Sequence, residues 1–122
     1  MILTRTKGQI ESRRHEERLA KVIGGSRVPA SGAFWSQKGD VRSTDLLIEH
    51  KWTGKETITV KAAVLEKIMT EAIMSGRTPV LGLSLRNRNY VVLDENDFFA
   101  LRDLLTQRED VSAGLETEGE LP

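Results

Sequence analysis

Residues 46–53 follow a strand pattern that limits the folds open to this chain. Side chains alternate between two sets, Leu46, Ile48, His50 and Trp52 on one side and Leu47, Glu49, Lys51 and Thr53 on the other. This period of two is typical of a β-strand, and it places Glu49 and Lys51 on one face. The apolar run at residues 46–48 is too hydrophobic for a strand that only borders solvent. We therefore expect a core strand with two charged groups that need partners.

Three helices are predicted around the strand segments. Residues 6–23 form the first, because Leu19 and Ile23 share a face at helical spacing and a glycine pair follows at Gly24 and Gly25. The second has an apolar stripe that ends at Gly76 and consists of Val64, Leu65, Ile68, Met69, Ala72 and Ile73. The last follows a cap at Asp94 or Asn96 and carries Phe98, Phe99, Leu101, Leu104 and Leu105.

Short strands are predicted between these helices. Residues 39–43 and 44–53 form two strands joined by a short turn, and residues 26–39, rich in Gly, Ser, Ala and Pro, are interpreted as a loop. Residues 78–85 form a buried strand and residues 89–94 a further strand, separated by a turn at 86–89. The hairpin region before the second helix gives the order α-β-β-β-α-β-β-α. The expected class is α/β, with a central mixed sheet flanked by helices on both faces.

The absence of cysteine removes several classes of function. Disulfide scaffolds, thiol catalysis and cysteine-ligated zinc are excluded, and the two histidines, His15 and His50, are too few for a histidine-rich metal cage. Both histidines are interpreted as structural, with His50 facing away from Glu49 and Lys51. No apolar run approaches the roughly 20 residues of a membrane span, and the N-terminus lacks a secretory hydrophobic stretch. We expect no membrane partner and a cytoplasmic location.

Charge is distributed unevenly along the chain. Residues 1–61 contain 12 Lys and Arg against 7 Asp and Glu, a net charge of +5, and the remainder carries −5. The basic half suits a polyanion such as nucleic acid, although solvated surface charge explains the same pattern. Residues 109–122 are acidic with little to bury, so we expect a disordered tail after a single domain spanning residues 1–108.

Asp40, Glu49 and Lys51 form the pattern with the clearest chemistry. Two carboxylates at the ends of paired strands can converge on one Mg²⁺, which prefers carboxylate oxygens and keeps waters for substrate phosphates. A lysine beside the second carboxylate can orient a water or offset phosphate charge. The alternative is a solvated face with alternating charges. Asp45 is a rival acid, but it lies about 13 Å from Glu49 along the strand, too far for one ion.

Two longer segments, RRHEERLAKVIGGSRVPASGAFWSQKGDV and DLLIEHKWT, resemble the PD-(D/E)xK nucleases of the restriction-endonuclease-like fold. The resemblance is greatest to archaeal-type Holliday junction resolvases and their small phage-borne relatives, and it covers about residues 7–105. It rests on a helix with a glutamate, a Ser-Gly loop, an aspartate that opens a strand, E-x-K in the next strand, a helix and a P-V-L strand. Gly39 precedes Asp40 where the family often has proline, which removes no ligand.

The resemblance implies roles for individual residues. Asp40 corresponds to the motif aspartate, Glu49 to the second metal-binding acid and Lys51 to the catalytic lysine. The family's helix glutamate is either Glu16 or Glu17, and Glu16 is preferred as a further metal ligand because it shares a face with Leu19 and Ile23. Ser31 matches a loop serine that lies near the active site and the DNA backbone, although turn chemistry also explains a serine there.

These roles predict a Mg²⁺-dependent DNA endonuclease that resolves four-way or other branched DNA as a homodimer, with Mn²⁺ able to replace Mg²⁺. The expected DNA contacts are Ser31, Arg13, Arg14, Arg27 and Lys38. One alternative is a less structure-selective phage-type nuclease of replication, recombination or packaging. The other is a module of the same fold that binds DNA without cleaving it.

Overall fold

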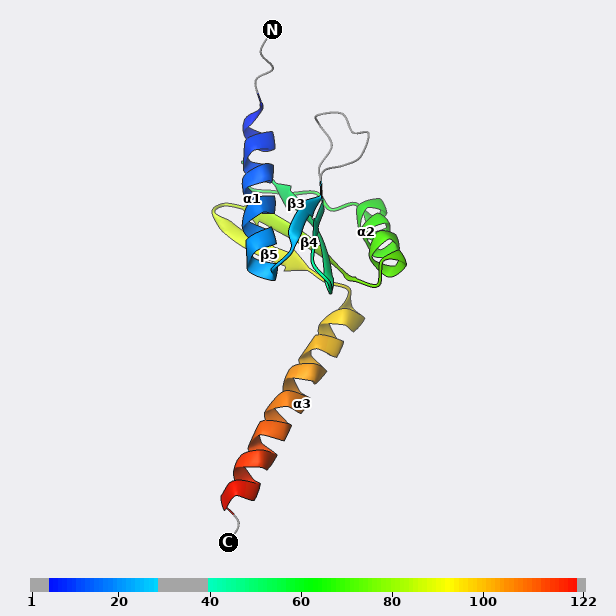
Figure 1. The fold of residues 1–122 in the computed structure, drawn as a ribbon. Helices are drawn as coiled ribbons and strands as arrows, with labels where there is room; N and C mark the ends of the chain where they lie inside the picture. Colours follow the sequence, from blue (N-terminus) through cyan, green and yellow to red (C-terminus); the bar gives the residue numbers. More distant parts are fainter. Residues whose placement is uncertain (1–4, 29–39, 121–122) are drawn as a thin grey trace. The chain divides into compact units, whose positions relative to one another are not determined.

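The computed structural model describes residues 5–28 and 40–120 (Figure 1). Within these residues the elements are α1 (Lys7–Ile23), β1 (Ser26–Val28), β2 (Asp40–Arg42), β3 (Leu46–Trp52), α2 (Ala62–Met74), β4 (Thr78–Leu85), β5 (Arg88–Val92) and α3 (Glu95–Glu120). The structure has the expected order α-β-β-β-α-β-β-α, although sequence patterning located only two of the three strands before α2. Sequence patterning placed residues 26–28 in a loop, because three residues are too few to display alternation.

The described strands form one five-stranded sheet in the order β1-β2-β3-β4-β5. β3 and β4 are parallel, and the other neighbouring pairs are antiparallel, so the sheet is mixed as expected. Parallel neighbours need a crossover connection, and α2 supplies it between β3 and β4. The β4–β5 turn is tighter than predicted, since only Arg86 and Asn87 separate the strands. Both have positive φ, 48° and 63°, as a type I′ hairpin turn requires.

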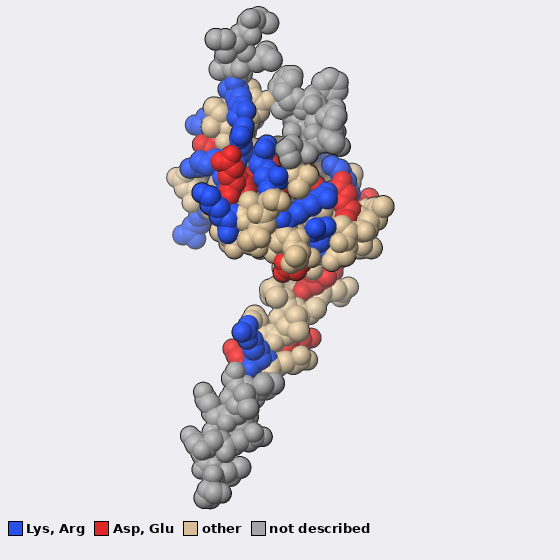
Figure 2. All heavy atoms as spheres, viewed as in Figure 1, with Lys and Arg blue, Asp and Glu red and all other residues tan. Residues whose placement is uncertain are grey.

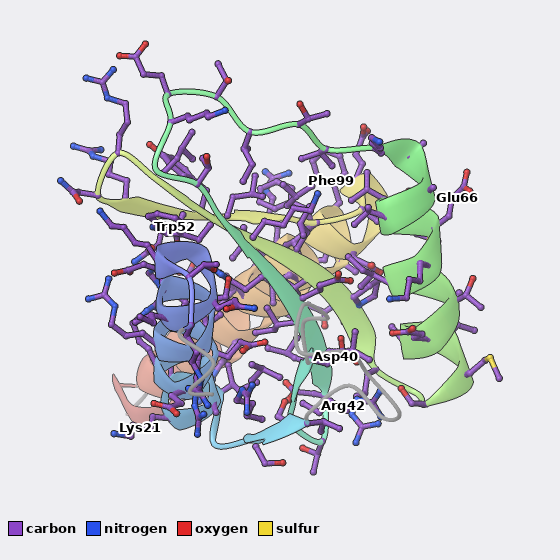
Figure 3. All side chains as sticks on the ribbon, turned by 90° about the horizontal axis from the view of Figure 1, so that it is seen from above. Lys21, Asp40, Arg42, Trp52, Glu66 and Phe99 are labelled. Carbon is purple, nitrogen blue, oxygen red and sulfur yellow. The ribbon has the colours of Figure 1, made fainter. Side chains whose placement is uncertain are left out.

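α1 and α2 cover opposite faces of the sheet (Figures 1 and 3). On the α2 face, Leu47 and Leu81 pack with Ile68 and Ala72 in a fully buried apolar cluster. On the α1 face, the ring of His50 stacks on that of His15, with centroids 4.5 Å apart. The predicted α/β class with helices on both faces is therefore confirmed, as is the orientation of His50 away from the face of Glu49.

α1 contacts the sheet through polar side chains. Its buried residues are Ser12, His15 and Glu16, whereas Ile10 is 53% exposed. His50 Nε2 donates to Ser84 Oγ at 2.7 Å, since the Ser84 hydroxyl itself donates to Asn89. A methyl group on Gly82, opposite His50, would lie 3.1 Å from the His50 ring, so glycine makes room for it.

The ends of α1 show why its boundaries were predictable. Thr6 and Gln9 form a capping box at the N-terminus. Gly24 ends the helix in the left-handed region, at φ 63°, and Gly25 has no room for a side chain, because a Cβ there would lie 2.1 Å from the Arg42 carbonyl oxygen. The glycine pair thus serves both helix termination and the approach of β2.

α3 begins at a cap that the sequence predicted. Asp94 caps it by accepting a hydrogen bond from the Asn96 amide, at 2.9 Å, and the helix spans Glu95–Glu120. The chain divides into two compact units, Met1–Val92 and Leu93–Pro122, and the domain boundary after Arg108 stays a prediction.

Five large apolar side chains in the first half of α3, within the second unit, are exposed. They are Phe98, Phe99, Leu101, Leu104 and Leu105. Among the helices of residues 5–28 and 40–120, none is long and apolar enough to cross a membrane.

The His15 site predicts an acid-sensitive fold. Burial, then the cations Arg18 and Arg14, lower the pKa of His15 from its ordinary 6.5, against an opposing effect of Glu11. Arg18 also donates to His15 Nδ1 at 3.2 Å, which requires that nitrogen unprotonated. Below pH 6.5 the unfolded chain gains a proton that the folded chain resists, so this stability is present above pH 6.5 and is lost as pH falls.

We expect the free energy of unfolding in urea to decrease between pH 7.5 and 5.5, and His15→Gln to flatten that dependence. An unchanged slope in the variant would assign the acid sensitivity to other groups.

Candidate functional site

Asp40 and Glu49 lie on adjacent antiparallel strands. The register of β2 and β3 pairs Val41 with Ile48 and Arg42 with Leu47, and the next pair in that register is Asp40 with Glu49. Residues opposite each other across such strands project from the same face, with Cβ atoms about 4.5–5.5 Å apart. The two carboxylates therefore come within reach of one cation, at the first residue of β2.

Lys51 lies on the same face, two residues beyond Glu49 and about 7 Å along the strand. Its Nζ donates to the Thr59 carbonyl oxygen at 3.4 Å, in the connection that leads from β3 to α2. On β4, the partners of Glu49 and Lys51 are Leu81 and Leu83, which belong to or pack against the α2-side core. The charged groups thus border an apolar surface, where electrostatic interactions are stronger than in water.

Arg42 completes this face of β2. It lies two residues from Asp40, and its Nη2 donates to Asp40 Oδ2 at 3.1 Å. Figure 3 shows the two labelled residues close together at one end of the sheet. The sequence reasoning missed Arg42, although the period of two that places Glu49 beside Lys51 also places Arg42 beside Asp40.

Glu16 does not join the carboxylates. Its Oε2 accepts a hydrogen bond from Arg27 Nε at 3.1 Å, and Glu16 is only 3% exposed. Arg27 pairs in register with Val41, which pairs with Ile48, so Arg27 points to the α1 face. Glu49 belongs to the opposite face. Helical spacing correctly predicted that Glu16 faces inward, but it could not specify that Glu16 meets an arginine there, and its role as a metal ligand stays a prediction.

The other expected site residues that the structure describes form ion pairs within the protein. Glu17 is exposed and pairs with Arg13 at 3.1 Å, while Arg14 pairs with Glu11 at 2.6 Å. Arg27 is held by Glu16, which makes it a weaker candidate for a phosphate contact than Arg13 or Arg14. The expected DNA contacts Ser31 and Lys38 lie outside the described residues.

Asp45 takes part in a local hydrogen-bond network with Ser43. Its Oδ1 accepts from Ser43 Oγ at 2.7 Å, and that hydroxyl in turn accepts from the Leu46 amide. These bonds shape the turn between β2 and β3. The rejection of Asp45 as a metal ligand on grounds of distance agrees with this arrangement.

The donor set suits a cation that needs few protein ligands. Within residues 5–28 and 40–120, no cluster of three or more His, Asp or Glu side chains is arranged to hold a metal. Asp40 and Glu49 supply two carboxylates, and Mg²⁺ commonly binds through one or two carboxylates together with waters and substrate phosphates. The described residues therefore fit Mg²⁺ or Mn²⁺ better than zinc, which prefers four nitrogen and sulfur ligands.

Lys and Arg side chains gather over α1 and the neighbouring sheet (Figure 2). The exposed fractions of the Arg13 and Arg14 side chains are 44% and 68%. Each arginine forms a surface ion pair with a glutamate. Such pairs are weak, so another anion can replace the glutamate. This surface can therefore contact a phosphate backbone.

Glu16→Gln separates a structural role from a metal-binding role. Loss of the charge partner of Arg27 should lower the melting temperature, while Mn²⁺ affinity stays at the unmutated value because Glu16 faces away from Asp40. Calorimetry of unfolding and Mn²⁺ titration measure the two effects, with exposed Glu17→Gln as the matched control. Weaker Mn²⁺ binding at an unchanged melting temperature would restore Glu16 as a ligand.

Comparison with known proteins adds no relative from which a role could be transferred. No family model, curated protein or solved structure matches the chain. The resemblance to PD-(D/E)xK nucleases therefore stays a prediction that rests on the motif residues. A function for this chain has to be argued from the face shared by Asp40, Arg42, Glu49 and Lys51.

Proposed function

We propose that this protein is a Mg²⁺-dependent DNA endonuclease with a restriction-endonuclease-like fold that acts on branched DNA. The observation that carries the proposal is the strand register that brings Asp40 opposite Glu49, with Lys51 next on the same face. Two carboxylates and a lysine on one face, beside an apolar surface, are the groups that metal-assisted phosphodiester hydrolysis needs.

Each residue has a distinct task in this proposal. Asp40 and Glu49 hold the cation, which when bound would lower the pKa of a water and neutralise charge on the departing oxygen. Lys51 places an ammonium group beside Glu49, where it can orient the attacking water or offset charge on the phosphate. Leu81 and Leu83 exclude water on the β4 side, which strengthens these interactions.

The substrate follows from charge and from the family resemblance. The exposed arginines of α1 favour a polyanion without selecting a sequence, since phosphate contacts carry no base information. The choice of a four-way junction and of a homodimer comes from the resemblance, because two symmetric cuts need two sites related by a two-fold axis.

One observation favours a second candidate, a module of the same fold that binds DNA without cleaving it. Arg42 already neutralises Asp40 within the protein, so the acid has a charge partner without any metal. A nuclease of low structural selectivity would use the same metal-assisted hydrolysis as the branched-DNA endonuclease and would differ only in the DNA that it cleaves.

Cleavage of a synthetic four-way junction in Mg²⁺ tests the proposal directly. Asp40→Asn and Glu49→Gln should each lower the cleavage rate at least ~100-fold, because an amide is a poorer Mg²⁺ ligand than a carboxylate. Lys51→Ala should cleave as poorly yet still bind Mn²⁺. Junction binding, measured by gel shift, should persist in all three variants.

A linear duplex and an EDTA arm serve as controls. Equal cleavage of duplex and junction would support the less selective nuclease. Binding without cleavage by the unmutated protein would support the non-catalytic module, and an Asp40→Asn protein that cuts at the unmutated rate would refute the site.

Arg13 and Arg14 should contribute affinity without contributing to chemistry. Replacing both with Gln should raise the dissociation constant for every DNA sequence and reduce the salt slope by about one per lost phosphate contact. The rate at saturating DNA should change little, because α1 packs on the face of His50, and Glu49 belongs to the other face of β3. Lys67→Gln on α2 is the control, and equal weakening by that variant would contradict an α1 interface.

A further inference from the structure

Arg42 shares its face of β2 with Asp40 and is only partly satisfied there. Its Nη2 donates to Asp40 Oδ2 at 3.1 Å, and the two side chains are 34% and 18% exposed. Its Nε is buried and has no hydrogen-bond partner among the described residues. Arg42 lies between Leu47 and Ser26 in the register, and neither side chain can neutralise a guanidinium. The guanidinium therefore relies on Asp40 while retaining an unused buried donor.

Among the described residues of β2 and β3 on this face, two acids and two bases have formal charges that sum to zero. Asp40 and Glu49 are two acids opposite each other, and Arg42 and Lys51 are two bases flanking them on the same strands. A divalent cation added to this neutral set leaves an excess of two positive charges beside an apolar surface, which is unfavourable unless anions accompany it. DNA phosphates are anions that the proposed substrate would bring.

The Asp40 carboxylate also cannot serve both cations equally. An oxygen that accepts from Arg42 has less electron density and less room for a metal ion, and a metal placed there would repel the guanidinium at short range. Binding of a cation at Asp40 must therefore weaken or displace the bond to Arg42. The displaced group carries several donors in a fork that matches a phosphate.

We propose that Arg42 is a positioning residue that couples metal binding to DNA binding. Without DNA it acts as the counterion of Asp40 and opposes the divalent cation. When metal and DNA bind together, the guanidinium leaves Asp40 and pairs with a backbone phosphate beside the metal. This inference rests on the proposed metal site. It adds that the protein binds a divalent cation weakly without DNA and tightly in the DNA complex.

Mn²⁺ titration of the full chain by electron paramagnetic resonance tests the coupling, with and without a junction whose phosphates are blocked against cleavage. Without DNA, Arg42→Gln should bind Mn²⁺ about 3- to 10-fold more tightly, because the competing charge is gone. With the junction, Mn²⁺ affinity of the unmutated protein should increase, and that of Arg42→Gln should increase less. Lys67→Gln, which removes an equal charge on α2, should behave as the unmutated protein does.

Two further variants assign the effect to the ion pair. In an Asp40→Asn background, Arg42→Gln should no longer alter Mn²⁺ affinity. Arg42→Met, which retains an apolar stem against Leu47, gives the same measurement if Arg42→Gln fails to fold.

Unmutated protein that binds Mn²⁺ with the same affinity as both Arg42 variants would overturn the coupling and leave the proposed metal site standing. Unmutated protein that binds no Mn²⁺ even with the junction would overturn the proposed function and the coupling together.

Discussion

The parallel pairing of β3 with β4 is the contact on which the rest of the structure depends. Seven residue pairs, from Leu46 with Thr78 to Trp52 with Ser84, keep the two strands in one register. This register directs Leu47 and Leu81 into the apolar cluster under α2, and it sends Glu49 and Lys51 to the same face. A slip by one residue would exchange the faces of every side chain on the strand. The core and the charged site are therefore specified by the same hydrogen bonds.

The two faces of the β3–β4 pair are stabilised by different interactions. Burial of apolar side chains stabilises the α2 side, where shortening a side chain would leave a cavity and lower the free energy of unfolding. The α1 side instead relies on the stacked rings of His15 and His50 and on the buried pair of Glu16 with Arg27, whose groups must all be satisfied together. α1 can thus be sensitive to protonation while the apolar cluster is not. The difference explains why a helix with few buried hydrophobic residues still has a defined position.

Sequence patterns predicted those parts of the fold that local chemistry dictates. The period of two in β3, the glycine pair after α1 and the cap at Asp94 follow from residues within a few positions of one another. The three-residue β1 and the partner of Glu16 were missed, because they depend on contacts between residues distant in sequence. Asp40, Glu49 and Lys51 were grouped correctly on one face, whereas Arg42 was overlooked although the same alternation places it there.

The basic and acidic parts of this chain have net charges that sum to zero, and this balance affects how the protein attracts a polyanion. The whole chain has no net charge, so it gives little long-range attraction to DNA. Residues 93–122 contain 2 Arg against 9 Asp and Glu, so residues 1–92 carry a net charge of +7 and the remainder −7. Attraction to DNA must then arise within about one Debye length of the basic unit, roughly 8 Å at physiological salt. In the proposed coupling, the field of the phosphates close to Asp40 and Glu49 favours a divalent cation that the protein alone disfavours.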